Sequence, residues 1–112
     1  MRLQQKFVEL RQEQAIPDQL LLLEHPPVIT LGRGGDVRNL LAPAATLDAQ
    51  RVRFFETTRG GDITYHGPGQ LVGYPILDLR DWKRDVGAYV RAVEQCIIDT
   101  LGDYGIEAGR IP

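Results

Sequence analysis

Apolar residues near the amino terminus recur at helical spacing: Leu3, Phe7 and Leu10 are separated by Gln, Glu and Arg. Positions i, i+4 and i+7 lie on one face of a helix, so the pattern predicts an amphipathic helix that ends before Pro17. A second pattern of this kind follows Asp85, whose side chain suits a helix N-cap. Its apolar members, which predict a helix with Gly102 as C-terminal cap, are Val86, Val90, Val93, Ile97 and Leu101.

Between these helices the apolar residues form short runs typical of strands. The continuous run 20–23 predicts a strand buried on both faces, and a His-Pro-Pro turn separates it from a strand at 28–31. Further strands are predicted at 52–57, 63–65 and 71–79, the last interrupted near Pro75, with a strand beginning at 105–108. The alanine-rich stretch 42–49 predicts a surface connection. The fold class predicted is α/β (α+β), with a mixed sheet and packed helices.

Composition narrows the possible settings of the protein. With 112 residues, the chain forms one domain at most. Hydrophobic residues make up 43% of it, yet no apolar run approaches the roughly 20 residues that span a bilayer. A net charge of -2 gives no general attraction for nucleic acid or anionic lipid, so neither is expected as a partner. A polar amino terminus and a single cysteine favour a reducing, cytoplasmic setting.

The segment from Arg59 to Gln70 contains four of the 12 glycines of the chain. Such density is typical of a backbone that turns sharply or lets a ligand come close. Its first eight residues also carry a guanidinium, a carboxylate, a phenol and an imidazole. Within it, Gly67-Pro68-Gly69-Gln70 predicts a type II turn, because proline presets the second position and glycine accepts the positive φ of the third.

Residues 59–70, continued by Leu71-Val72-Gly73-Tyr74-Pro75, closely resemble the signature of the octanoyltransferases of lipoate biosynthesis, also called lipoyl(octanoyl) transferases. Residues 22–33, Leu-Leu-Glu-His-Pro-Pro-Val-Ile-Thr-Leu-Gly-Arg, are similar to the strand-turn-strand of the same family. The resemblance implies a fold like that of the biotin and lipoate protein ligases. It also implies that residues 1–112 are a single, partial catalytic domain, with both ends of the family's domain missing.

The resemblance implies an acyltransferase that moves an octanoyl group from acyl carrier protein to a lysine of a lipoyl domain through an acyl-cysteine thioester. Its partners would be octanoyl-acyl carrier protein and the lipoyl domains of 2-oxoacid dehydrogenases and of the glycine-cleavage H protein. The acyl group would be carried on phosphopantetheine, and no further cofactor or metal is expected. The nucleophilic cysteine and its activating lysine are expected beyond Pro112, so no catalytic residue is predicted within the chain.

By the same resemblance, one segment is expected to line the acyl pocket with its backbone near the thioester. The substrate-binding residues so implied are Arg59, Gly60, Gly61, Asp62, Ile63, Thr64, Tyr65 and His66. From the residues alone, Arg59 and Asp62 could pair with each other or cap strand ends, or Arg59 could meet phosphopantetheine or an acidic carrier protein. His66 could be a general base, an orienting hydrogen-bond donor, or a histidine satisfied by a backbone carbonyl.

Three other features favour structural interpretations. His25, which precedes two prolines in a turn, is predicted to be structural. Cys96 lies in the middle of the second predicted helix, where a thiol is expected to be a small buried hydrophobe. The tetrapeptide Arg-Gly-Gly-Asp occurs at 33–36 and at 59–62, but the flanking residues differ, so no structural repeat is predicted.

Two other functions compete with octanoyl transfer. A lipoate or biotin protein ligase shares the fold but activates a free acid with ATP, and such ligases generally carry a different loop sequence. A non-catalytic fragment or binding module is the other possibility, because the expected nucleophile is missing. A chain that lacks half of its sheet is also expected to expose apolar surface and an unpaired strand edge.

Overall fold

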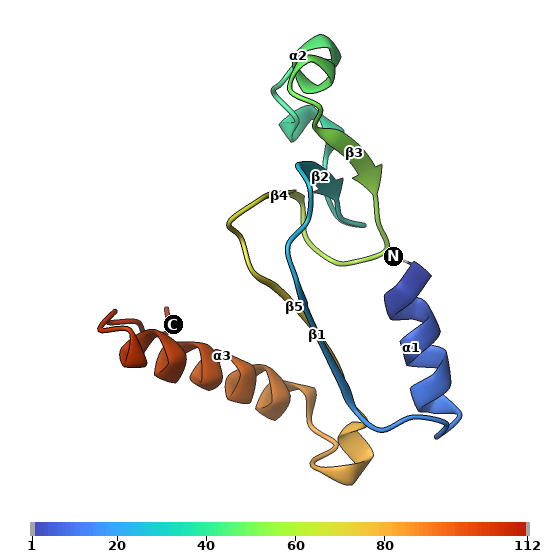
Figure 1. Cartoon of the computed structure of the whole chain (residues 1–112), viewed down its shortest axis with the longest axis vertical. Helices are drawn as coiled ribbons and strands as arrows, with labels where there is room; N and C mark the ends of the chain where they lie inside the picture. The colour runs from blue at the N-terminus through green and yellow to red at the C-terminus, as the bar shows by residue number, and fades with distance from the viewer. Residues whose placement is uncertain (1, 112) are drawn as a thin grey trace. The chain divides into compact units, whose positions relative to one another are not determined.

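The structure is a computed structural model that describes residues 2–111. It divides into two compact units, one formed by the chain up to Gln19 together with the chain from Ile76 onward, the other by Leu20–Pro75. The elements, drawn in Figure 1, are α1 (Arg2–Gln12), β1 (Gln19–Leu23), β2 (Val28–Leu31), η1 (Val37–Asn39), α2 (Ala44–Ala49), β3 (Arg53–Glu56), β4 (Ile63–His66), β5 (Val72–Ile76), η2 (Leu79–Asp81) and α3 (Val86–Asp103).

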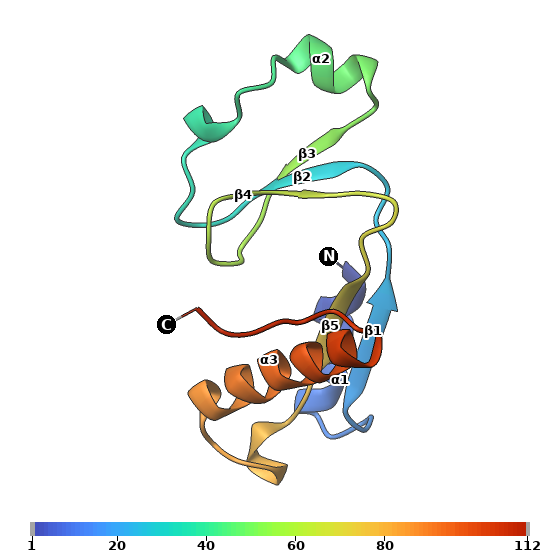
Figure 2. The ribbon, with the colours of Figure 1, turned by 90° about the vertical axis from the view of Figure 1, so that its left-hand side faces the viewer.

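A three-stranded sheet organises the unit Leu20–Pro75, and β2 is its central strand. β2 runs parallel to β3, with Val28 opposite Arg53, and antiparallel to β4, with Val28 opposite His66. Figure 2 shows the three strands side by side, and β1 beside β5 in a separate two-stranded sheet. The prediction of an α/β fold with a mixed sheet is confirmed.

Two details of the predicted strands are wrong. β1 was expected to be buried on both faces, but its exposure alternates, and the side chains of Leu20 and Leu22 are 61% and 60% exposed. In the part of the chain that the structure describes, β1 has β5 as its only partner strand and nothing buries this face of the pair. β5 ends at Ile76 rather than at Leu79, because the chain turns into η2 three residues later.

The two predicted amphipathic helices are confirmed as α1 and α3, and Asp85 is the N-cap of α3: its carboxylate accepts a hydrogen bond from the Ala88 N–H at 2.8 Å. This bond lowers the pKa of the Asp85 carboxyl. The stretch 42–49 lies on the surface, as predicted, and six of its residues form the short helix α2 behind Pro43, which was not predicted. Alanine is the best helix former, and proline's fixed φ and missing N–H cost little at a helix start.

Gly102 was expected to end the second helix, but it lies inside α3, and Gly105 takes the terminal role with φ of 72°. Its N–H donates to the Gly102 carbonyl, and the Ile106 N–H donates to the Leu101 carbonyl, which is the Schellman arrangement. The strand expected from 105 is therefore absent among the described residues, because this capping turn occupies its start. α1 and α2 end in the same way, with Gln14 and Arg51 at the positive φ.

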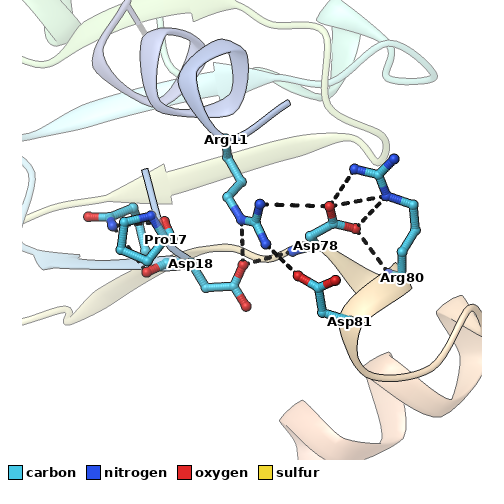
Figure 3. Close-up of polar contacts among 7 residues, drawn as sticks. Arg11, Pro17, Asp18, Asp78, Arg80 and Asp81 are labelled. Atoms are coloured by element: carbon cyan, nitrogen blue, oxygen red, sulfur yellow. Dashed lines mark hydrogen bonds and ion pairs between the residues drawn. The ribbon is translucent and has the colours of Figure 1, made fainter. Parts of the chain in front are cut away.

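An ion-pair network holds α1 to η2 in the unit that contains both, and Figure 3 shows Arg11 of α1 pointing among three carboxylates. Arg11 nitrogens lie 2.7 Å from Asp18, 2.8 Å from Asp81 and 3.8 Å from Asp78. Hydrogen bonding to Arg80 lowers the pKa of Asp78, and hydrogen bonding to Arg11 lowers that of Asp18. The Asp78 N–H also donates to the Asp18 carboxylate.

The apolar core is small. Among the described residues, the buried apolar side chains are Leu31, which is 8% exposed, and Ile76, which is 9% exposed. Much apolar surface is open instead, as predicted, and on α3 it includes Val86, Val90 and Ile97. None of the helices among the described residues has the length and apolar character needed to cross a bilayer.

Candidate functional site

The segment predicted to bind substrate, residues 59–66, begins in the loop after β3 and ends with β4. Residues 59–62 form the loop, and the next four residues are β4 itself, paired to β2 from Leu31 opposite Ile63 to Val28 opposite His66. The sheet therefore fixes the second half of the segment. The first half needs other contacts, and side chains of the loop supply them.

The Arg59 side chain folds back onto its own loop and onto β2. Its guanidinium donates to the Thr30 carbonyl and hydroxyl at 2.9 and 2.7 Å, to the Gly60 carbonyl at 2.8 Å and to the Asp62 carbonyl at 2.9 Å. Arginine offers five N–H donors in a rigid fork, which suits several fixed carbonyl acceptors at once. Arg59 therefore holds the shape of the loop.

Asp62 does not pair with Arg59 in the described structure, so the interpretation of these two residues as an ion pair is wrong. One oxygen of the Asp62 carboxylate accepts from the Asp36 N–H at 3.1 Å and from the Ile63 N–H at 2.8 Å. The other accepts from the side-chain amide of Asn39. Asp62 thus fixes residues 36–39 beside the glycine loop.

Gly32 allows the two loops to touch. A methyl group on Gly32 would lie 2.7 Å from the carbonyl oxygen of Gly60 and closer still to that of Gly61, which no real side chain tolerates. The backbone bonds formed across this contact run from the Arg33 N–H to the Arg59 carbonyl at 2.8 Å and from the Gly32 N–H to the Asp62 carbonyl at 3.3 Å. Only glycine at position 32 permits so close an approach.

His66 ends β4, and its Nδ1 lies 2.6 Å from the side-chain oxygen of Gln70. This partner is a side-chain amide, so a histidine satisfied by a backbone carbonyl is not what the structure shows at Nδ1. This hydrogen bond to Gln70 orients the imidazole ring of His66. A nitrogen lone pair on a half-buried ring can orient a donor or accept a proton.

His25 and His66 lie together, with 5.7 Å between their ring centroids. His25 Nε2 is 2.7 Å from the Tyr74 hydroxyl, and the two rings meet edge to face. This fixed contact agrees with the structural role predicted for His25. The sequence alone does not link the two histidines because they are 41 positions apart, and only the strand pairing brings them close.

The predicted type II turn is confirmed. The Gln70 N–H donates to the Gly67 carbonyl at 3.2 Å, and Gly69 has φ of 87°. The Gly69 N–H also donates to the Glu24 carboxylate at 2.8 Å, which ties the turn to the end of β1. Gly67 is buried beside the Tyr65 ring, and a side chain at position 67 would require that ring to move.

Cys96 was expected to be buried, and this is wrong: its side chain is exposed on α3. It lies 11 residues into the helix, far from the N-terminal turn that could lower the pKa of a thiol. Its position therefore does not support a catalytic role. Nor does any group of three or more His, Cys, Asp or Glu side chains among the described residues have an arrangement that could hold a metal ion.

A shallow hollow lies elsewhere in the unit Leu20–Pro75, between α2 and β3. Arg53 covers the face of Phe55 at 4.8 Å beside it. None of the predicted substrate-binding residues lines this hollow, whose lining is Ala44, Leu47, Asp48, Arg51, Val52, Arg53, Phe54 and Phe55.

The resemblance to a known family that the sequence showed is confirmed along the whole chain. Residues 1–112 match the family described as the lipoyl protein ligase A/B catalytic domain. The chain belongs to this family.

The most informative relatives are octanoyltransferases. The chain is 68% identical to that of Solibacter usitatus over 112 residues, covering 100% of the chain and 51% of the relative. It is 53% identical to that of Myxococcus xanthus over 106 residues, covering 95% and 30% respectively. It is 50% identical to that of Flavobacterium johnsoniae over 107 residues, covering 94% and 46%. The chain thus spans about half the length of these relatives, or less.

Proposed function

We propose that the intact protein transfers an octanoyl group from acyl carrier protein to a lysine of a lipoyl domain, in the cytoplasm, during lipoate biosynthesis. The observation that carries the proposal is the 68% identity to an octanoyltransferase along the whole chain, glycine loop included. The acceptors would be lipoyl domains of 2-oxoacid dehydrogenases or the glycine-cleavage H protein. A cysteine thioester would carry the acyl group between two transfers, without metal or nucleotide.

In this proposal the eight residues from Arg59 to His66 form one wall of the acyl site, with different tasks. Arg59 and the Asp62 carboxylate shape the loop through the contacts described above. Tyr65, which is 53% exposed, and the half-buried His66 are available to a ligand. His66 would orient the thioester or the attacking amine. Cys96 is not proposed as the nucleophile, given its position within α3.

The test of transfer against ligation uses the intact protein and an unmodified lipoyl domain. One reaction contains octanoyl-acyl carrier protein, and the other contains octanoate with ATP and Mg²⁺. Mass spectrometry of the lipoyl domain is expected to show octanoylation only in the first reaction. Octanoylation only in the second would make the protein a ligase, and none in either would favour a non-catalytic binding module.

The role of His66 is tested by His66→Ala, with His25→Ala as the matched control. Loss of an orienting or proton-accepting imidazole is expected to lower kcat/KM for octanoyl transfer by about 100-fold. His25→Ala removes the bond to Tyr74 and is expected to affect stability more than turnover. An unchanged kcat/KM for His66→Ala would remove this role.

A further inference from the structure

The connection between η2 and α3 carries a tryptophan and a group of positive side chains on its surface. Trp82 is 59% exposed, and Lys83 and Arg84, which follow it, are exposed too. Arg91 is exposed on the second turn of α3, and its guanidinium reaches back over Gly87, where an added methyl group would lie 3.4 Å from it. We call Trp82, Lys83, Arg84 and Arg91 the basic surface. All four residues belong to one unit of the molecule.

The three cations of the basic surface have no ion-pair partner among the described residues. The carboxylates just before them in the sequence are taken by other groups: Asp78 pairs with Arg80, and Asp81 pairs with Arg11, as Figure 3 shows. The net charge of the chain is -2, so this excess of positive charge is local.

Asp85 is close to two of these cations, but its carboxylate already caps α3. It accepts from the Ala88 N–H, and this bond together with the charges of Lys83 and Arg91 lowers the pKa of the Asp85 carboxyl. Positive charge near the N-terminal end of a helix opposes the helix dipole. The stability of α3 therefore does not account for the cations, whereas a negatively charged partner would.

The chain that carries the basic surface is held in one conformation. The Trp82 N–H donates to the Leu79 carbonyl at 3.3 Å, which closes η2. The Asp85 N–H donates to the Lys83 carbonyl at 2.8 Å, which places Arg84 at the tip of a γ-turn. A segment that is already ordered loses little conformational freedom when a partner binds.

Tryptophan and arginine often supply much of the binding energy of protein interfaces, and cations steer an acidic partner toward its site. An exposed Trp82 ring also leaves a large apolar area in water, which a docked partner would cover. We propose that the basic surface docks acyl carrier protein through an acidic face of that protein. The inference rests on the proposed function and deepens it by naming a surface for the acyl donor. The carrier is favoured over the lipoyl domain because the phosphate of its phosphopantetheine arm adds a further anion for arginine to bind.

The first test measures the Kd of the intact protein for acyl carrier protein by isothermal titration calorimetry. The carrier bears unacylated phosphopantetheine, so that acyl transfer does not disturb the titration. Lys83→Glu is compared with Lys6→Glu, because these are the two lysines of the chain, both are exposed, and Lys6 lies on α1 outside the basic surface. Lys83→Glu is expected to raise the Kd about 10-fold in about 50 mM salt and much less in about 500 mM salt, because mobile ions screen exposed charges. Lys6→Glu is expected to leave the Kd unchanged.

The outcomes of this test separate the basic surface from the proposed function. Lys83→Glu places a negative charge before α3, which favours the helix dipole, so weaker binding is not explained by loss of the helix. Equal Kd values for the two variants, in a protein that transfers octanoyl groups, would refute the basic surface and leave the proposed function standing. Carrier binding that depends on Lys83, in a protein that does not transfer octanoyl groups, would do the reverse. A Lys83→Glu variant that loses affinity for the lipoyl domain and not for the carrier would overturn the choice of partner.

The second test uses Trp82, the only tryptophan of the 112 residues, as a reporter. The difference in fluorescence between the intact protein and its Trp82→Phe variant isolates the emission of this ring. The emission is expected to move to shorter wavelength when the carrier is added, because docking removes the ring from water. Trp82→Ala is expected to raise the Kd about 10-fold, and Trp82→Phe to restore most of the affinity, since a phenyl ring keeps much of the apolar contact. Emission that stays unchanged while the carrier is bound would exclude Trp82 from the interface.

Discussion

The sequence Arg-Gly-Gly-Asp occurs twice within one unit of the molecule, and the two copies do different work. In the second copy, residues 59–62, the arginine is half-buried and bonds to carbonyl groups, and the aspartate binds the neighbouring loop. In the first copy, residues 33–36, the arginine is exposed, and the aspartate caps its own 3-10 turn and pairs with exposed Arg38. The two identical tetrapeptides therefore make different contacts because different elements precede and follow them.

The copies also touch each other, although they do not form a repeat. The Arg33 N–H donates to the Arg59 carbonyl, and the Asp36 N–H donates to the Asp62 carboxylate. Only the second copy has a glycine at positive φ, so the backbones differ as well. This agrees with the absence of a structural repeat predicted from the flanking residues. The number of fixed partners, rather than residue type, distinguishes the two copies.

The largest expected effect comes from exchanging the two arginines in turn for methionine. Arg59→Met leaves the carbonyls of Thr30, Gly60 and Asp62 without their shared donor and is expected to lower the free energy of unfolding by about 2 kcal/mol. Arg33→Met removes an exposed side chain and is expected to stay within about 0.5 kcal/mol. Urea denaturation of the intact protein measures both. Equal losses would erase the contrast between the copies.

The aspartates give the next largest contrast. Asp62→Ala removes the acceptor of three donors, the N–H groups of Asp36 and Ile63 and the Asn39 amide, and is expected to cost about 1–2 kcal/mol. Asp36→Ala removes a local cap and an exposed pair, so its cost is expected to be smaller. The same denaturation experiment ranks the two. A larger loss for Asp36→Ala would show that the first copy, rather than the second, holds the loops together.

The sequence predicts the local features of this unit and of α1, but not the contacts between residues that are far apart in the chain. The periodicity of Leu3, Phe7 and Leu10 and the Gly67-Pro68-Gly69 turn are local, and both are confirmed because the local pattern alone determines them. The role of Arg59 depends on carbonyls of Thr30, 29 residues earlier, which no local pattern reveals. The glycine at position 32 was the available signal, since a glycine directly after a buried strand favours close backbone contact.

Exposure was the property that sequence predicted least well. Leu20, Leu22 and Cys96 were expected to be buried because of their residue types and neighbours, and all three are exposed. Burial depends on what covers a face, and periodicity reports only which face is apolar. The glycine-rich segment 59–70 does turn sharply, as its glycine content predicted. Its assignment to substrate binding remains a prediction.

The third contrast separates the two glycines of the second copy. Gly61→Ala places a residue with a side chain at a φ of 85° and is expected to lower the free energy of unfolding by about 1 kcal/mol or more. Gly60→Ala, whose added methyl meets nothing within 4 Å, is expected to cost less than about 0.5 kcal/mol. Thermal unfolding followed by circular dichroism compares them. A Gly60→Ala variant that is less stable than Gly61→Ala would contradict the loop conformation described here.

The smallest expected effect concerns pH and the first copy. Hydrogen bonds from Arg38 lower the pKa of the Asp36 carboxyl below its ordinary value of 3.8. A carboxyl whose pKa is lower in the folded state stabilises the fold above its unfolded pKa, and this contribution is lost as pH falls through the folded pKa. Arg38→Met is therefore expected to lower the urea midpoint slightly at pH 6 and by less at pH 2. Arg11→Met is expected to lower the midpoint more at pH 6, because Arg11 pairs with three carboxylates. Part of its effect is expected to remain at pH 2, because the pKa of Asp78 is held well below its ordinary value, chiefly by hydrogen bonding to Arg80. An Arg38→Met effect that persists unchanged at pH 2 would mean that the arginine acts through packing rather than through the carboxylate.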